Sequence, residues 1–281
     1  MKKILLVGML FPLFAHAQWK VNLFGGFANY SGDLQSGRYT TSQANGAFGA
    51  GIQYDFTSHF SILSNLTYGR ISAADGYSNQ ADLRARNLNF ESVIGEWNLL
   101  LEYNLLDLNE HRLTPYVFGG IAFFHFNPYS YDSAGKKVYL RPLSTEGEGL
   151  SQYPDRKPYA LTQFALPFGG GIKFRVSDRV TLAWEIGMRK SFTDYLDDVS
   201  TRYVDQNILL AARGPEAVAM AYRGSELKNG APYPAAGSIR GGSKNKDWYY
   251  MSGFRLTIDL HDGQMIHHRR DAILDCPKKV Y

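Results

Sequence analysis

The feature that most constrains this chain is the alternation of apolar and polar residues in segments of about ten residues. Segment 45–56 shows it clearly, because one face carries Phe48, Ala50, Ile52, Tyr54 and Phe56. A period of two predicts a β-strand between two different environments. Strands with lipid on one face and a lumen on the other, joined by turns and long loops in alternation, are typical of outer-membrane β-barrels.

Eight segments of this kind occur, at 19–30, 45–56, 60–70, 87–104, 116–126, 166–174, 180–188 and 248–260. The connectors 57–59, 105–112 and 177–179 are short, whereas 31–44, 71–86, 127–160 and 194–246 are long. With a periplasmic N-terminus, every long connector falls on the outer side of the membrane. The sequence therefore predicts an all-β fold, an eight-stranded antiparallel transmembrane β-barrel over 18–260 with long extracellular loops.

The fourth segment, 87–104, changes phase. Its apolar residues first occupy even-numbered positions (Leu88, Phe90 and Ile94). They then occupy odd-numbered positions (Trp97, Leu99, Leu101 and Tyr103). A one-residue slip turns a hydrophobic set to the opposite face, so we expect a bulge near Gly95. Segment 116–126 has apolar residues at both even and odd positions, so its register cannot be assigned from the alternation.

The first 17 residues predict export. Lys2 and Lys3 precede an apolar run over 4–14, and Ala15-His16-Ala17 is a small-x-small cleavage site, so 1–17 reads as a signal peptide. No later stretch has the roughly 20 continuous apolar residues of a membrane helix. We expect an integral protein of the bacterial outer membrane with both termini in the periplasm.

The side chains that face the lumen include many charged residues. By parity the expected lumen charge network contains Glu96, Glu102, Lys173, Arg175, Glu185, Arg189 and Arg255, together with Asp55 and Asp259. An eight-stranded barrel is only wide enough to be filled by side chains, so opposite charges are expected to pair into a plug. A selective pore is the alternative, and it needs a bias of sign that this set lacks.

Motifs for catalysis are missing from the sequence pattern. There is no G-x-S-x-G, H-E-x-x-H or P-loop signature, and Glu96 and Glu102 are expected at different heights of the barrel wall. The net charge of +4 is spread along the chain and gives no basis for nucleic-acid binding. We expect no enzyme activity, no cofactor and no small-molecule substrate.

An acidic run follows the seventh segment, with Asp194, Asp197 and Asp198. Such oxygen ligands can hold calcium, but the spacing lacks the glycine and the final glutamate of an EF-hand loop. We favour a solvated acidic rim or a salt-bridge knot with Arg189 and Lys190. The loops 127–160 and 194–246 contain aromatic and rigid residues and are expected to be at least partly ordered against each other, with 224–246 the most mobile part.

The tail 261–281 continues beyond the last strand and is expected in the periplasm. Its basic and apolar residues suggest a docking segment for a partner, with a disordered overhang as the alternative. The candidate partner-binding residues are Arg269, Arg270, Ile273, Leu274, Cys276, Lys278 and Lys279. Cys276 is the only cysteine, so in an oxidising compartment an intermolecular disulfide and a free thiol are both open.

Several stretches resemble a known family. Tyr153-Pro154-Asp155-Arg156-Lys157-Pro158-Tyr159, Pro167-Phe168-Gly169-Gly170-Gly171-Ile172-Lys173-Phe174 and 189–200, which contains Phe192-Thr193-Asp194-Tyr195-Leu196-Asp197-Asp198-Val199-Ser200, are similar to PorG-like outer-membrane barrels of the type IX secretion system. The entry Gly25-Gly26-x-x-Asn29-Tyr30-x-Gly32-Asp33-Leu34 is similar too. The resemblance covers most of the chain after the signal peptide.

The resemblance implies an accessory role in protein transport. Members of that family tether a periplasmic ring, made of a PorK-type lipoprotein and a PorN-type ring protein, to the outer membrane. It also implies that a PorK-type lipoprotein donates the second sulfur if Cys276 forms a disulfide. The alternative is a stand-alone small barrel that binds a ligand through its outer loops or acts as a minor porin, since a fold alone does not fix function.

Overall fold

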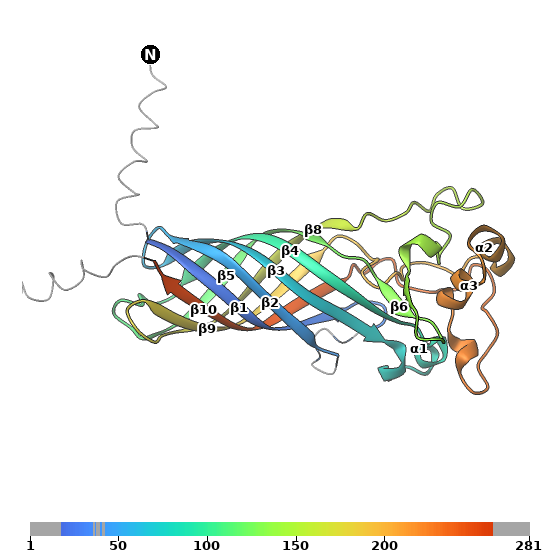
Figure 1. Cartoon of the computed structure of the whole chain (residues 1–281), viewed down its shortest axis with the longest axis horizontal. Helices are drawn as coiled ribbons and strands as arrows, with labels where there is room; N and C mark the ends of the chain where they lie inside the picture. Colours follow the sequence, from blue (N-terminus) through green and yellow to red (C-terminus); the bar gives the residue numbers. More distant parts are fainter. Residues whose placement is uncertain (1–17, 36, 38–39, 41–42, 261–281) are drawn as a thin grey trace, which may run out of the picture.

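The computed structural model describes residues 18–35, 37, 40 and 43–260. Eight long strands make up the body of the molecule (Figure 1). They are β1 (Gln18–Ser31), β2 (Asn45–Asp55), β3 (Phe60–Ala74), β4 (Asn89–Asn104), β5 (Leu113–His125), β8 (Thr162–Arg175), β9 (Val180–Ser191) and β10 (Trp248–Asp259). Each predicted strand is present, with ends that differ by a few residues.

The strands form one closed antiparallel ring. Their order is β3-β2-β1-β10-β9-β8-β5-β4, and the pairing of β3 with β4 completes the circle. Every strand therefore has hydrogen-bonded neighbours on both edges, which a strand in lipid requires. The prediction of an eight-stranded transmembrane β-barrel of the outer-membrane type is confirmed.

The outer surface of the ring is a belt of apolar side chains. Leu66 on β3 is 67% exposed and Phe48 on β2 is 62% exposed, and each of the other strands contributes similar residues. Such a patch on a water-soluble surface would drive aggregation, whereas it matches a hydrocarbon environment. No helix in the described ranges is both long enough and apolar enough to span a membrane.

The predicted bulge at Gly95 is wrong. β3 and β4 pair without interruption past this point, with Tyr68 opposite Gly95 and Gly69 opposite Ile94. Phe90 and Ile94 point inward and are buried, although they are apolar. The phase of the apolar residues changes because the lumen itself becomes apolar near this end of the barrel, so no shift of register is needed.

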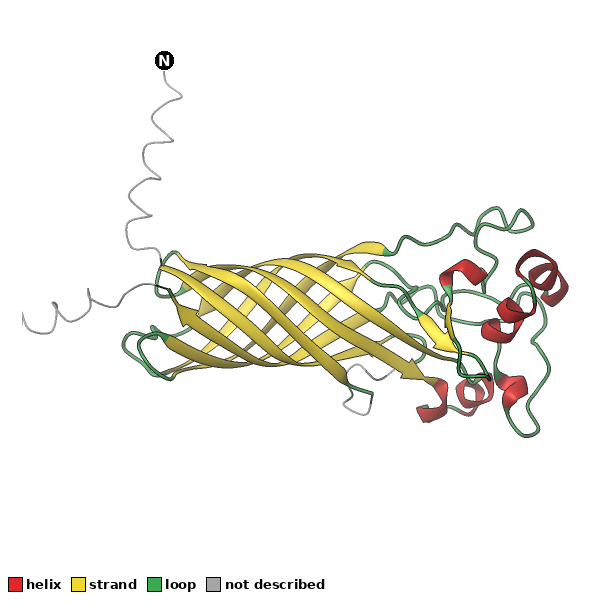
Figure 2. Ribbon diagram, viewed as in Figure 1, coloured by secondary structure: helices red, strands yellow, loops and turns green. Residues whose placement is uncertain are grey.

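The long loops gather at one end of the barrel and form a cap (Figure 2). We define the cap as the described residues of the connectors 32–44, 75–88, 126–161 and 192–247. It contains the hairpin β6 (Tyr129–Tyr131) and β7 (Lys137–Tyr139), the helices α1 (Ala81–Arg86), α2 (Gln206–Arg213) and α3 (Pro215–Ala221), and the 3₁₀ turns η2 (Asp75–Tyr77), η3 (Arg141–Leu143) and η4 (Gly224–Glu226). We call the half of the barrel interior next to the cap the upper lumen. Buried Leu196, Leu209 and Met220 extend the apolar core of the upper lumen into the cap.

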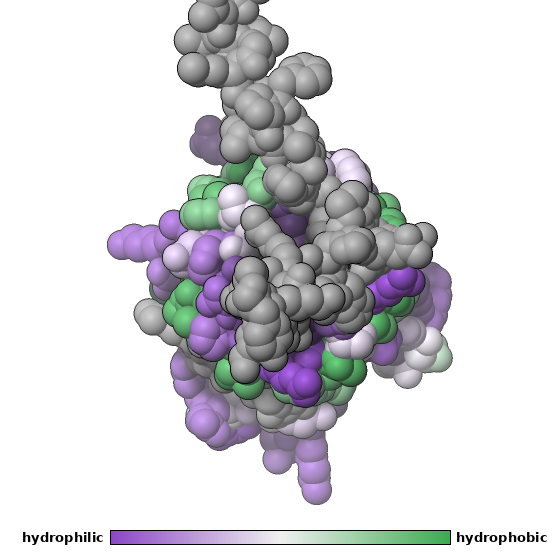
Figure 3. Space-filling model, turned by 90° about the vertical axis from the view of Figure 1, so that its left-hand side faces the viewer, coloured by the Kyte–Doolittle hydropathy of each residue, from purple (hydrophilic) through white to green (hydrophobic). Residues whose placement is uncertain are grey.

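The opposite end, which we call the turn end, carries the short connectors. β1 begins there and β10 ends there, so both ends of the barrel wall leave the molecule on the same side (Figure 1). Viewed from this end, apolar side chains appear at several points around the circumference among hydrophilic residues (Figure 3). The predicted signal peptide 1–17 and tail 261–281 lie outside the described residues.

Leu66 offers a test of the lipid-facing belt. An arginine near the middle of the bilayer costs about 2–4 kcal/mol on a barrel surface, so Leu66→Arg should lower the free energy of unfolding in lipid vesicles by that amount. The assay is urea unfolding followed by tryptophan fluorescence. The matched variant Leu227→Arg, at a 39% exposed position of the cap, should lose little. Equal losses in both variants would contradict the assignment of the belt.

Candidate functional site: the filled lumen and the cap

Glu102 on β4 lies at the centre of the lower lumen, which is the half of the barrel interior toward the turn end. It is fully buried, and its two carboxylate oxygens bind Lys173 of β8 and Arg255 of β10. The Lys173 ammonium also donates to Asn104 Oδ1 at 2.8 Å. Two cations thus share one anion, and the three side chains come from strands that are distant in sequence. Removing Glu102 leaves the buried Lys173 ammonium without an ion-pair partner.

Glu185 supplies the second anion of this layer. Its carboxylate lies 3.2 Å from Arg255 Nε and accepts a hydrogen bond of 2.6 Å from the Tyr116 hydroxyl. The Tyr116 ring also lies beneath both cations, with the Lys173 nitrogen 4.6 Å from its centroid. The two acids and the two bases balance in charge, so the layer fills the lumen as a neutral plug.

Glu96 holds a second layer closer to the cap. Arg189 Nε lies 3.2 Å from its carboxylate, the Tyr249 hydroxyl donates to it at 2.7 Å, and Asn98 donates at 2.7 Å. Glu96 and Glu102 belong to separate layers, as expected from their places in the strand. The structure does not bring them together as an acid–base pair.

A third layer closes the turn end. Lys20 lies 3.0 Å from Asp55 and 3.5 Å from Asp259. Sequence parity placed the two acids in the lumen, and the inward phase of Lys20 on β1 is the signal that identifies their partner. Arg175 does not join the network, since it makes no ion pair with another described residue.

The cap is held by buried ion pairs of its own. Arg240 binds Glu146 at 3.0 Å and lies 3.9 Å from Asp198. Glu146 also accepts the backbone N–H groups of Ser200 and Thr201 at 2.9 and 2.8 Å. The contact between Glu146 and 200–201 confirms the prediction that the loops 127–160 and 194–246 pack together.

One expectation for this region is wrong. Asp194, Asp197 and Asp198 do not form a solvated rim or a knot with Arg189, because each is at most 2% exposed and Arg189 is bound to Glu96. The error arises because the partners of these acids, such as Tyr30 and Arg240, are far away in sequence. Most of segment 224–246 is exposed, although Arg240 within it is buried, and the mobility of this segment stays a prediction.

Burial raises the pKa of several acids in the cap. The pKa of Asp198 rises to about 6, although Arg240 and hydrogen bonds from Thr145 and Tyr159 oppose the shift. The pKa of Glu148 rises to about 8 because burial is reinforced by Asp198 and Glu146. Within the described residues, no three acidic, histidine or cysteine side chains are placed to hold a metal ion.

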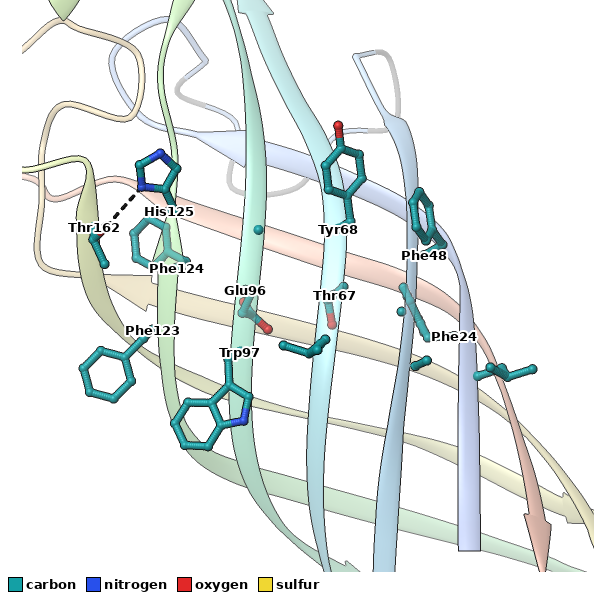
Figure 4. A pocket seen from close by; sticks show the side chains of 15 residues that line it. Phe24, Phe48, Thr67, Tyr68, Glu96, Trp97, Phe123, Phe124, His125 and Thr162 are labelled. Atoms are coloured by element: carbon teal, nitrogen blue, oxygen red, sulfur yellow. Dashed lines mark hydrogen bonds between the residues drawn. The ribbon is translucent and has the colours of Figure 1, made fainter.

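A hollow of about 830 Å³ lies on the barrel wall over β1 to β5 (Figure 4). Phe48, Tyr68, Trp97 and Phe123 border it, and the polar pair His125 and Thr162 lies at one end, 3.1 Å apart. Phe48, Tyr68, Trp97 and Phe123 belong to the lipid-facing belt, so the hollow opens on the apolar outer surface of the barrel. It lacks the convergent polar groups of a site for a polar substrate.

These features define a class: an integral outer-membrane β-barrel with a lumen filled by paired charges and a folded cap. The chain belongs to the family described as a domain of unknown function, DUF6089, whose profile matches residues 2–210. Comparison with curated proteins finds no match. The candidate tail residues Arg269, Arg270, Ile273, Leu274, Cys276, Lys278 and Lys279 lie outside the described residues.

Solved structures with a similar fold are outer-membrane proteins. Neisserial surface protein A is 8% identical with a TM-score of 0.43, and the alignment covers 87% of this chain and 99% of that one. OprG of Pseudomonas aeruginosa is 11% identical with a TM-score of 0.38, covering 86% and 97%. A major outer-membrane protein of Thermus thermophilus is 13% identical with a TM-score of 0.40, covering 87% and 99%.

Glu102→Gln tests the lower layer of the lumen. The change leaves Lys173 without its anion and Arg255 with Glu185 alone, which should lower the free energy of unfolding by about 3–5 kcal/mol. Urea unfolding in vesicles measures it. Glu110→Gln, in the exposed connector between β4 and β5, is the matched control and should be close to neutral. A loss below about 1 kcal/mol for Glu102→Gln would contradict the plug.

Proposed function

We propose that this protein is a non-catalytic outer-membrane anchor of the type IX secretion machinery. The barrel provides the hold in the membrane, and the tail 261–281 binds a periplasmic ring of a PorK-type lipoprotein and a PorN-type partner. In this proposal both termini are periplasmic and the cap is extracellular. No cofactor or small-molecule substrate takes part.

The observation that carries the proposal is the filled lumen. Three layers of paired charges, centred on Lys20, Glu102 and Glu96, occupy the barrel, so its wall is used for attachment rather than for passage. β1 begins and β10 ends at the turn end, and in this proposal the turn end faces the periplasmic ring. The resemblance of 153–159, 167–174 and 189–200 to PorG-like barrels supports the same role.

A stand-alone surface-binding barrel is the second candidate. The cap favours it, because a buried core and internal ion pairs such as that of Arg240 with Glu146 make it a folded platform and not a set of loose loops. A minor porin is disfavoured by the paired charges that fill the lumen.

Deleting 261–281 separates the two candidates. An anchor should lose its co-purifying lipoprotein and ring protein from solubilised native membranes, while its barrel stays folded. Mass spectrometry of the pulled-down material measures this. The control keeps the tail and replaces the exposed cap cations Lys136 and Lys137 with alanine, and it should retain both partners. Partners that remain bound after the deletion would overturn the anchor.

Cys276 tests whether the attachment is covalent. As the only cysteine it cannot form an internal bridge, so an oxidised Cys276 requires a sulfur from a second chain. Non-reducing gels of native membranes should show a larger band that disappears with reductant and in Cys276→Ser. A monomer that reductant does not change would leave only non-covalent docking.

A further inference from the structure

Three aspartates lie together where the cap meets the barrel. Asp194 and Asp197 follow β9, and Asp247 directly precedes β10. Their exposures are 2%, 1% and 0%. None of the three forms an ion pair with another described residue. A buried carboxylate without a cation is costly in its charged form, so this arrangement needs an explanation.

One phenol hydroxyl joins two of these acids. Tyr30 Oη lies 2.6 Å from Asp197 Oδ2 and 3.1 Å from Asp247 Oδ1. A phenol has a single hydrogen to donate, so it can satisfy only one of the two oxygens. The other contact becomes favourable when the carboxyl group itself carries a proton and donates to the phenol oxygen. The contacts of Tyr30 are therefore satisfied best when Asp197 or Asp247 carries a proton of its own.

Asp194 adds an independent observation. Its Oδ2 accepts a hydrogen bond of 2.7 Å from Ser200, whereas its buried Oδ1 has no hydrogen-bond partner. A charged carboxylate rarely leaves a buried oxygen unpaired, whereas a protonated acid carries less charge on that atom. The remaining contacts of the three acids are backbone N–H groups, from Val199 to Asp197 and from Leu196 to Asp247.

The charged groups around the cluster do not neutralise it. Asp33 and Glu146 add negative charge from the neighbouring loops. Arg86 faces the cluster, but its guanidinium is bound to Asp75 through two hydrogen bonds of 2.7 Å. Lys246 is exposed and donates to the Ser243 carbonyl at 3.2 Å.

We propose that Asp194, Asp197 and Asp247 form a proton-operated latch, which keeps the cap closed on the barrel while it holds protons and loosens it when they leave. Through Tyr30, the latch joins the end of β1 to Asp197 in the loop after β9 and to Asp247 at the start of β10. Its ligand is the proton, because one Tyr30 hydroxyl faces two carboxyl groups and the buried Oδ1 of Asp194 has no hydrogen-bond partner.

The direction of the effect follows from proton linkage. Burial raises the pKa of Asp194 to about 7 and the pKa values of Asp197 and Asp247 well above the ordinary value of 3.8. The closed cap therefore binds more protons than the open one, and its stability is lost as pH rises from the ordinary pKa through the raised one. Each retained proton makes the opening constant rise about tenfold per pH unit in that interval.

Hydrogen exchange of the whole mature protein in lipid vesicles tests the latch between pH 5 and 9. After correction for intrinsic rates, amides of 194–201 should open at least about tenfold more per pH unit between pH 5 and 7. Amides of β3 serve as the internal reference for an intact barrel and should not change.

Asp247→Asn is the decisive variant, because the new amide keeps the acceptor for Leu196 and can donate to Tyr30. It should lower the slope of the logarithm of the opening constant against pH by about one, because one titrating group is lost. At pH 8 it should make the exchange of 194–201 slower than in the unmodified protein. Asp197→Asn should act the same way, and Asp155→Asn, at an exposed position of the cap, should leave the slope unchanged.

Three results would overturn the proposal. The first is an unchanged slope in both Asp197→Asn and Asp247→Asn. The second is loss of protection of 194–201 at every pH in both variants, because the carboxylates would then serve only as fixed hydrogen-bond acceptors. The third is suppression of the pH dependence by millimolar calcium in the unmodified protein but not in Asp247→Asn, which would identify a cation site in place of a proton site.

Discussion

The structure depends on the seam where the first strand meets the last. At this seam Gly26 lies opposite Gly253, and a Cβ atom on either would come within about 2.6 Å of backbone atoms of the other strand. Close approach of the two backbones is therefore possible only with glycine on both sides. Closure of the seam removes the last free edges of the sheet, which a membrane does not tolerate. It also fixes the lumen at a width that side chains must fill.

A narrow lumen explains why its charges are arranged in pairs. Glu102, Lys173 and Arg255 come from β4, β8 and β10, and they meet only when all three strands have the correct register. Slippage of one strand by one residue would turn its charged side chain toward lipid and leave the others buried without a partner. The network therefore fixes the register of the strands and also fills the lumen.

The residues that face lipid could be predicted from the sequence, whereas the contacts inside the lumen and the cap could be predicted only in part. Alternation identifies Phe48 and Ile52 as lipid-facing because lipid is uniform, and parity alone then places Glu96 and Glu102 in the lumen. Parity does not reveal that the upper lumen is apolar, which is why Phe90 and Ile94 suggested a bulge. It also does not reveal the partners of the acidic run after β9, because Tyr30 and Arg240 approach it only through the folded cap. Local pattern carries no information about such long-range contacts.

The cap changes what the long loops mean. Long loops on a small barrel are ordinarily connectors, but here a core of Leu196, Leu209 and Met220 continues from the apolar upper lumen without a break. Barrel and cap therefore share one hydrophobic core, and disturbance at the top of the barrel is felt in the cap. Acids with raised pKa values lie at this junction, where they stabilise the closed arrangement only while protonated. The lower lumen, by contrast, is balanced in charge. The barrel is thus built as a fixed support, and its capacity to respond to conditions lies at its capped end.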